Sequence, residues 1–243
     1  MNIRMALVID LNKCVGCHAC ATNCKSWNTG GTFGPLTDHE PYGKNPHGVW
    51  FNRVQTYEIG KYPNTEILYL PKSCMHCKDA ACVKVCPTSA TYKREEDGIV
   101  LVNYDECIGC KYCSWACPYG AREFDDYDGV MKKCTLCVDR IYNENLPEEE
   151  RKPACVLACP TSARTFGNIN DPESEAAIKI REANGYKLMP EVGTSPSNHY
   201  LPKQKVKMRI DEDEILARKH VIVATEKKVS SYAEIIAEDI AVP

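Results

Sequence analysis

Residues 107–118 read CIGCKYCSWACP, in which four cysteines are spaced C-x2-C-x2-C-x3-C and are followed by Pro118. A [4Fe–4S] cube needs four thiolates at its corners, and a C-x2-C-x2-C loop supplies three of them. The fourth cysteine lies about one helical turn further on and, as in two-cluster ferredoxins, points to another cluster. Gly109 lies inside the loop, where a positive φ and a close backbone approach are useful. The segment therefore predicts iron–sulfur ligation in a ferredoxin-like module.

Three further groups repeat the pattern and bring the total to 16 cysteines in 243 residues. The first group in chain order is Cys14, Cys17, Cys20 and Cys24, spaced like the run above and with Gly16 in its loop. The second is Cys74, Cys77, Cys82 and Cys86, spaced C-x2-C-x4-C-x3-C and followed by Pro87. The third is the run quoted above, and the fourth is split into Cys134 and Cys137, then Cys155 and Cys159 before Pro160. Because structural zinc sites usually pair two doublets, the repeated triplets favour iron–sulfur clusters over zinc.

The cysteine groups lie in a recurring frame of extended segments. Apolar stretches at residues 6–9, 67–70 and 98–102 precede the first three groups and predict strands. Each Cys-Pro pair leads into a small-residue turn and another extended stretch, as in residues 86–92 and 159–166. We predict an α+β fold made of two ferredoxin-like modules of the bacterial 2[4Fe–4S] type. The spacing alone leaves open which groups pair.

The composition excludes several classes of function. The formal net charge of −3 gives no reason to expect a nucleic-acid partner. No apolar run reaches the roughly 18 residues of a membrane span, and the stretch Met5–Ile9 is too short for a secretory signal. We therefore expect a reducing compartment without stable disulfides. Residues 30–34 do not match a dinucleotide fingerprint, and we expect a non-catalytic chain that transfers electrons.

The four groups together resemble those of the four-cluster iron–sulfur subunits of the DMSO reductase superfamily of molybdenum oxidoreductases. The resemblance covers roughly residues 4–202. It implies that the first group pairs with the fourth and the second with the third, so that one ferredoxin is inserted into another. The implied domains are a split first module at 1–24 and 130–202, an insertion with a hairpin at 25–73, a second module at 74–129, and a polar C-terminal extension at 203–243.

The resemblance also implies the iron ligands of four [4Fe–4S] clusters, and it assigns no catalytic residue. Set 1 is Cys14, Cys17, Cys20 and Cys159; set 2 is Cys134, Cys137, Cys155 and Cys24; set 3 is Cys74, Cys77, Cys82 and Cys117; set 4 is Cys107, Cys110, Cys113 and Cys86. Nitrate reductase relatives have Trp at one ligand of the third group, whereas this chain has cysteine at all four. One departure from the pattern is that Cys24 is followed by Lys25 rather than proline.

Within the superfamily, residues 34–38, 50–56, 151–155 and 199–202 resemble the iron–sulfur subunits of membrane-bound sulfite dehydrogenases. This implies a complex with a large molybdopterin catalytic subunit and an integral membrane anchor that binds quinone. Electrons would pass from sulfite to quinone, at the cytoplasmic face of the inner membrane or, alternatively, in the periplasm after co-export. DMSO, tetrathionate and polysulfide reductases use a similar subunit with the flow reversed. A free polyferredoxin and a zinc-stabilised scaffold stay open as alternatives.

Several segments outside the ligands carry weaker expectations. Residues 25–73 read as a long ordered loop and a hairpin near 50–57, which either contacts a partner subunit or shields a cluster of this chain. Residues 138–154 read as a solvated insertion.

Four side chains inside the cysteine loops are interpreted as second neighbours of the clusters. His18 and His76 are expected to tune a cluster without ligating it, because the cysteines fill every corner. Tyr112 and Trp115 are expected to provide apolar shielding, with a role as electron stepping stones as the alternative.

Overall fold

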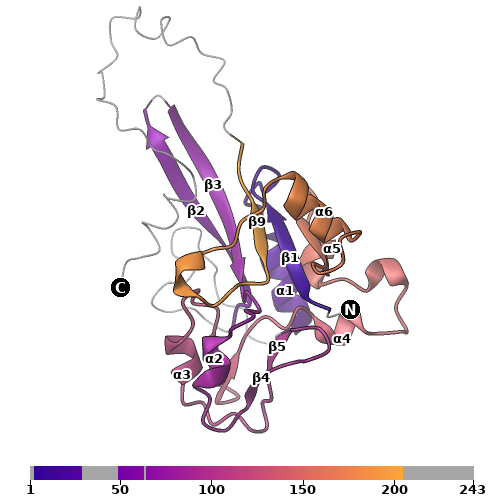
Figure 1. Ribbon diagram of the computed structural model, residues 1–243. Helices are drawn as coiled ribbons and strands as arrows, with labels where there is room; N and C mark the ends of the chain where they lie inside the picture. The colour runs from indigo at the N-terminus through magenta and orange to yellow at the C-terminus, as the bar shows by residue number, and fades with distance from the viewer. Residues whose placement is uncertain (1–2, 29–48, 63, 205–243) are drawn as a thin grey trace, which may run out of the picture.

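Figure 1 shows the computed structural model of the chain, which describes residues 3–28, 49–62 and 64–204. Short helices and short strands are mixed within these ranges, as predicted. The strands are β1 (Met5–Asp10), β2 (Asn52–Lys61), β3 (Asn64–Ser73), β4 (Thr91–Lys93), β5 (Val100–Val102), β6 (Glu123–Asp125), β7 (Val130–Lys132), β8 (Arg164–Asn168) and β9 (His199–Leu201). The helices are α1 (Ala19–Asn28), α2 (Ala81–Lys84), α3 (Tyr112–Trp115), α4 (Val138–Ile141), α5 (Ala154–Leu157) and α6 (Glu175–Glu182), with 3₁₀ turns at Glu148–Glu150 and Pro190–Val192.

A three-stranded sheet joins the beginning of the described chain to its end. β1 lies between β8, to which it is antiparallel, and β9, to which it is parallel. Leu7 is thereby paired with Phe166. Helix α6 contacts all three strands, and Val8, Ala176 and Leu201 form a small apolar core there. The apolar run of β1 is buried on both faces of the sheet, because Val8 packs in this small core while Leu7 and Ile9 pack in the two larger cores. The first predicted strand therefore forms.

Strands β2 and β3 form a long antiparallel hairpin that extends away from the other elements (Figure 1). Asn52 pairs with Ser73 at its base and Lys61 with Asn64 at its tip. The base is buried and the tip is exposed, with Val54 and Leu70 packed in the core. The predicted hairpin near 50–57 is thus confirmed, whereas most of the loop before it lies outside the described residues.

The cysteine groups lead into helices that pack in pairs. Helices α1, α2, α3 and α5 lie in the first, second, third and fourth groups, respectively. Contacts join α1 to α5 and α2 to α3, while β4 pairs with β5 and β6 with β7. The first group is therefore a neighbour of the fourth, and the second of the third. A nested arrangement requires these neighbours, although the division of the chain into two modules stays a prediction.

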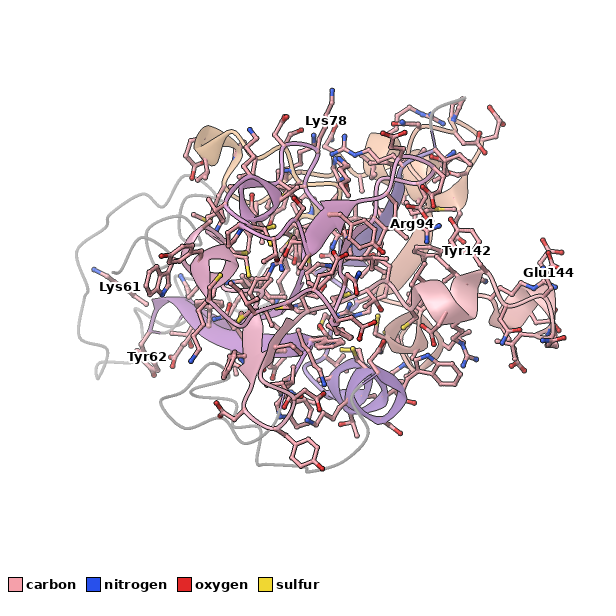
Figure 2. The ribbon with its side chains drawn as sticks, turned by 90° about the horizontal axis from the view of Figure 1, so that it is seen from below. Lys61, Tyr62, Lys78, Arg94, Tyr142 and Glu144 are labelled. Carbon is pink, nitrogen blue, oxygen red and sulfur yellow. The ribbon has the colours of Figure 1, made fainter. Side chains whose placement is uncertain are left out.

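The segment 138–154 lies at the periphery of the molecule, where Glu144 projects away from the rest of the chain (Figure 2). Its anchor is Tyr142, which lies beside Arg94 in the same view, with the guanidinium 5.4 Å from the ring centroid. The Tyr142 hydroxyl donates a hydrogen bond of 2.9 Å to Asp97. The remainder is largely exposed, as expected for a solvated insertion.

The helices of the described ranges are short or polar, and none of them has both the length and the apolar character needed to cross a membrane. The predicted C-terminal extension, 203–243, lies outside the described residues from residue 205 onward.

Candidate iron–sulfur centres

Glycines shape the loops of the first and third cysteine groups. Gly16 has a φ of +70° and Gly109 a φ of +65°, both in the left-handed region that favours glycine. A Cβ atom on Gly109 would lie 2.5 Å from the carbonyl oxygen of Gly129, and one on Gly16 would overlap the ring of Tyr69. Both loops therefore need glycine for space as well as for conformation, which confirms the expectation of a positive φ there.

Set 1 surrounds a small cavity. All four of its cysteines line this cavity, together with Pro71, His18 and Arg164. Three of these cysteines come from the first cysteine group, whereas Cys159 comes from the last group in the chain. The structure thus brings together side chains that are far apart in sequence, at the place where the resemblance implies a shared centre.

Set 3 surrounds a second small cavity. Its four cysteines line the cavity together with Met75, Tyr119 and Arg122. Three cysteines come from the second group and Cys117 comes from the third, so the construction repeats that of set 1. Within the described ranges, no three or more His, Cys, Asp or Glu side chains converge as ligands of a single metal ion.

Set 2 is a buried group of thiols, two of which contact the same side-chain amide. Burial raises the pKa of Cys24 well above its usual value, and the nearby thiolates of Cys134, Cys155 and Cys137 raise it further. The side-chain amide of Asn28 lies 3.6 Å from the sulfur of Cys24 and 3.5 Å from that of Cys137. Cys24 therefore lies near its predicted partners despite the absence of a following proline.

Set 4 is brought together in part. Burial raises the pKa of Cys113, and the neighbouring thiolates of Cys107 and Cys110 act in the same direction. Cys86 has its hydrogen bonds within its own loop, where the backbone amide of Thr91 donates to its sulfur at 3.3 Å. The fourth member of this set stays a prediction.

The chemistry of these thiols fits an iron–sulfur cluster. Burial raises the pKa to about 12 for Cys134 and to about 11 for Cys155. Thiolates crowded in a region of low polarity repel one another, so they need a positive charge at their centre. Iron supplies that charge and binds the deprotonated sulfur, with release of the thiol protons. The crowding of sulfur around apolar cavities is therefore consistent with the predicted cofactor.

His76 interacts directly with a predicted ligand. The imidazole is fully buried, and its Nδ1 accepts a hydrogen bond of 3.1 Å from the backbone amide of Val100. Nε2 therefore carries the proton, and Cys74 is the thiol with which the buried ring interacts. Burial would raise the pKa of Cys74, but interactions with His76 and the positive charges of Lys133 and Arg122 hold it well below its usual value. This contact is consistent with the expected tuning role.

The expectation of apolar shielding is wrong for Trp115, which exposes 79% of its surface. Tyr112 is also exposed, and the two rings are tilted partners with centroids 5.6 Å apart. Helix α3 is a single turn, so residues three apart lie on the same face. Cys113 faces the interior, whereas these two rings lie on the exposed face of the helix.

The sequence reasoning missed three buried cations beside the sulfur atoms, namely Lys133, Arg122 and Arg164. The Nη2 of Arg122 lies 2.9 Å from the sulfur of Cys82, and the Nη1 of Arg164 lies 3.7 Å from that of Cys155. A signal was present, because both arginines stand five positions after the cysteine of a Cys-Pro pair.

Comparison with known proteins gives one family and a consistent group of relatives. The family of 4Fe-4S dicluster domains matches residues 65–169. A sulfite dehydrogenase subunit of Allochromatium vinosum is 64% identical over 87% of this chain and 88% of its own length. The putative iron-sulfur subunit of a dimethyl sulfoxide reductase of Halobacterium salinarum is 36% identical over 86% of each chain. A tetrathionate reductase subunit of Salmonella typhimurium is 37% identical over 82% of this chain and 72% of its own length.

Proposed function

The chain belongs to the family of iron–sulfur electron-transfer subunits of the DMSO reductase superfamily, and on this premise we propose that it conducts electrons in a complex that oxidises sulfite. The subunit is non-catalytic, like its relatives. In the proposal, four [4Fe–4S] clusters connect a large molybdopterin catalytic subunit to an integral membrane anchor that reacts with quinone.

The sixteen cysteines are proposed as the ligands, in sets 1 to 4. The observation that carries this assignment is the pair of cavities lined by sets 1 and 3, each with three cysteines from one group and one from another. The nearness of Cys24 to the other members of set 2 supports the same exchange of fourth ligands, since Asn28 contacts the sulfur atoms of both Cys24 and Cys137. When bound, such clusters supply one-electron transfer at potentials set by hydrogen bonds to sulfur, burial and charge. The chain holds the sulfur donors in place and buries several of them, whereas Cys17 is exposed.

The nested division of the chain is part of the proposal. Residues 1–24 and 130–202 would form one ferredoxin-like module, with 74–129 inserted as the second. The pairing of β1 with β8 supports it, because these strands come before the first group and after the last. The contacts of α1 with α5 and of α2 with α3 support it independently.

Sulfite is proposed as the substrate of the complex because the relative at 64% identity is a sulfite dehydrogenase subunit. The relatives at 36 and 37% identity are subunits of reductases for dimethyl sulfoxide and tetrathionate. They define the second candidate, which is the same electron-transfer role in a reductase. A free polyferredoxin is less well supported, because the apolar side chains of Ile108 and Trp115 are 66% and 79% exposed beside the third group.

The complex is proposed to lie at the cytoplasmic face of the inner membrane, with the periplasm as the alternative. In this arrangement the membrane anchor, rather than this chain, would provide the attachment. Protease treatment of intact spheroplasts distinguishes the two sides. Protection of the chain until the cells are lysed supports the cytoplasmic side, and digestion in intact spheroplasts would contradict it.

The central test is anaerobic purification of the full chain together with whatever remains bound to it. We expect about sixteen iron and sixteen sulfide atoms per chain, since each of four clusters holds four of each. We also expect a large molybdenum-containing subunit in the same fraction, and reduction of a quinone analogue when sulfite is added. Low iron would contradict the clusters, a chain without partners would favour the free carrier, and activity with tetrathionate alone would favour the reductase.

A further inference from the structure

Two buried arginines occupy the same position in the internal repeat. Residues 117–122 read CPYGAR and residues 159–164 read CPTSAR, so that an arginine stands five positions after each cysteine. The third copy, residues 86–91, reads CPTSAT and ends in threonine. The cysteines of the two arginine copies, Cys117 and Cys159, are the predicted fourth members of sets 3 and 1. The arginines therefore accompany the two sets that surround the cavities described above.

Arg122 forms part of the wall of the set 3 cavity. Its side chain is buried, with Nη2 at 2.9 Å from the sulfur of Cys82 and Nη1 at 3.1 Å from the hydroxyl oxygen of Thr91. Burial alone would lower the pKa of Arg122, but the neighbouring thiolates of Cys82 and Cys74 raise it. The positive charge of this guanidinium is thus balanced by sulfur.

Arg164 forms part of the wall of the set 1 cavity in the same way. Its Nη1 lies 3.7 Å from the sulfur of Cys155, a member of set 2, and its Nη2 donates to the Asn52 side chain at 2.7 Å. Among the described residues, neither Arg164 nor Arg122 forms a salt bridge with a carboxylate. Each buried charge therefore faces cysteine sulfur as its counter-ion.

We propose that Arg122 and Arg164 are paired tuning residues that raise the reduction potentials of the iron–sulfur clusters they border, set 3 for Arg122 and sets 1 and 2 for Arg164. The inference rests on the proposed function, because it requires clusters at these sets. Reduction adds one electron and makes a cluster with four thiolates more negative. A cation in a buried, poorly screened position stabilises the reduced form more than the oxidised form. Its hydrogen bond to sulfur acts in the same direction.

The competing explanation is that the arginines only organise the fold through Thr91 and Asn52. Variants that remove the acceptor groups of Thr91 and Asn52 but keep both arginines distinguish this explanation from redox tuning. Thr91→Val keeps the size of the side chain and the backbone amide that donates to Cys86, but removes the hydroxyl that accepts from Arg122. The same hydroxyl also bonds to Cys86 of set 4, so this control is judged on the midpoint of the set 3 cluster alone. Asn52→Leu removes the acceptor of Arg164 in the same manner.

The experiment is a redox titration of the full chain, purified anaerobically with its clusters and followed by EPR. The variants are Arg122→Gln, Arg122→Lys, Arg164→Gln and Arg164→Lys, with Thr91→Val and Asn52→Leu as matched controls. Arg181→Gln is the control for a general change of charge, because Arg181 is exposed on α6 and donates to the Pro172 carbonyl. Iron and sulfide are counted in every preparation.

We expect each glutamine variant to lower the equilibrium constant for reduction of a bordering cluster at least tenfold, which equals a midpoint about 59 mV lower for one electron. The lysine variants should lower the midpoint potential by less, and the three controls should change it little. The Arg122 and Arg164 variants should affect different EPR signals. Full iron content with unchanged midpoints would overturn the inference. Loss of a cluster in both the glutamine and the lysine variant of an arginine would also overturn it, by assigning that arginine to assembly. Absence of clusters from the unaltered chain would instead refute the proposed function.

Discussion

The side-chain oxygen of Asn198 accepts a hydrogen bond of 2.9 Å from the backbone amide of Leu7, across 191 positions of sequence. The nitrogen of the same side-chain amide donates to the backbone carbonyl of Cys74 at 3.0 Å. Asn198 is fully buried. One side chain thus ties strand β1 to the loop of the second cysteine group and so joins the two predicted modules.

Replacing Asn198 by leucine should strongly destabilise the protein. The volume is nearly conserved, but a backbone amide and a carbonyl lose their partners in the interior, at about 1–3 kcal/mol each. We expect the free energy of unfolding to fall by about 2–6 kcal/mol, measured from the shift of the denaturation midpoint in urea. Asn145→Leu, at an exposed position of the same residue type, should change it by less than about 0.5 kcal/mol. Equal midpoints for the two variants would contradict the bridging role.

The sequence predicted the parts of the fold that depend on local spacing. The strands β1, β3 and β5 lie where the apolar runs predict them, and Gly16 and Gly109 have the positive φ expected in the loops. These features follow from residues close together in the chain. The outward orientation of Trp115 was not predicted, because the direction of a side chain on a one-turn helix depends on what that turn packs against.

The long-range contacts of the site could not be predicted from local sequence patterns. Arg122 and Arg164 look like ordinary basic residues in the sequence, and only the packed structure shows that they face sulfur. The Cys-Pro repeat placed them in equivalent positions, but the repeat does not say which cysteine each one reaches. The contact of Asn198 with two modules likewise depends on the complete fold.

Cys24→Ser should alter the cluster of set 2 and leave that of set 1 intact. Cys24 lies in the first group, yet its neighbouring sulfur atoms belong to Cys134, Cys155 and Cys137. We expect EPR of the reduced protein to show one altered signal, the same one that Cys137→Ser alters. Cys17→Ser, in the same group as Cys24, should alter a different signal, so matching spectra of the Cys24 and Cys17 variants would refute the exchange of fourth ligands.

Gly109→Ala should prevent normal assembly of the third cysteine loop. A left-handed conformation costs a residue with a Cβ atom about 1–2 kcal/mol, and here the Cβ would also lie 2.5 Å from the Gly129 carbonyl oxygen. We expect the variant to retain about four fewer iron atoms per chain than the unaltered protein. Gly120→Ala is the matched control, because Gly120 has a φ of +58° but no atom within 4 Å of the added Cβ. An equal loss of iron in both variants would show that conformation alone, rather than the clash, is responsible.

His199 should make the protein less stable in mild acid. Burial lowers its pKa to about 4, and the charges of Lys187 and Arg4 act in the same direction. Its Nδ1 donates to the Ser197 carbonyl at 2.8 Å, which fixes the neutral tautomer. The unfolded chain, with a pKa near 6.5, binds a proton between about pH 6.5 and 4 that the folded chain does not bind. The stability that His199 contributes is therefore complete above about pH 6.5 and is lost as the pH falls toward 4.

The variant His199→Gln isolates this contribution. Glutamine keeps a donor for the carbonyl but does not titrate, so the variant should lose less stability than the unaltered protein between pH 7 and pH 5. The full shift corresponds to at most about 3 kcal/mol. The measurement is the difference in urea midpoint between the two proteins at each pH, which cancels acid effects common to both, including loss of iron. A difference that does not change with pH would show that His199 does not titrate in this window.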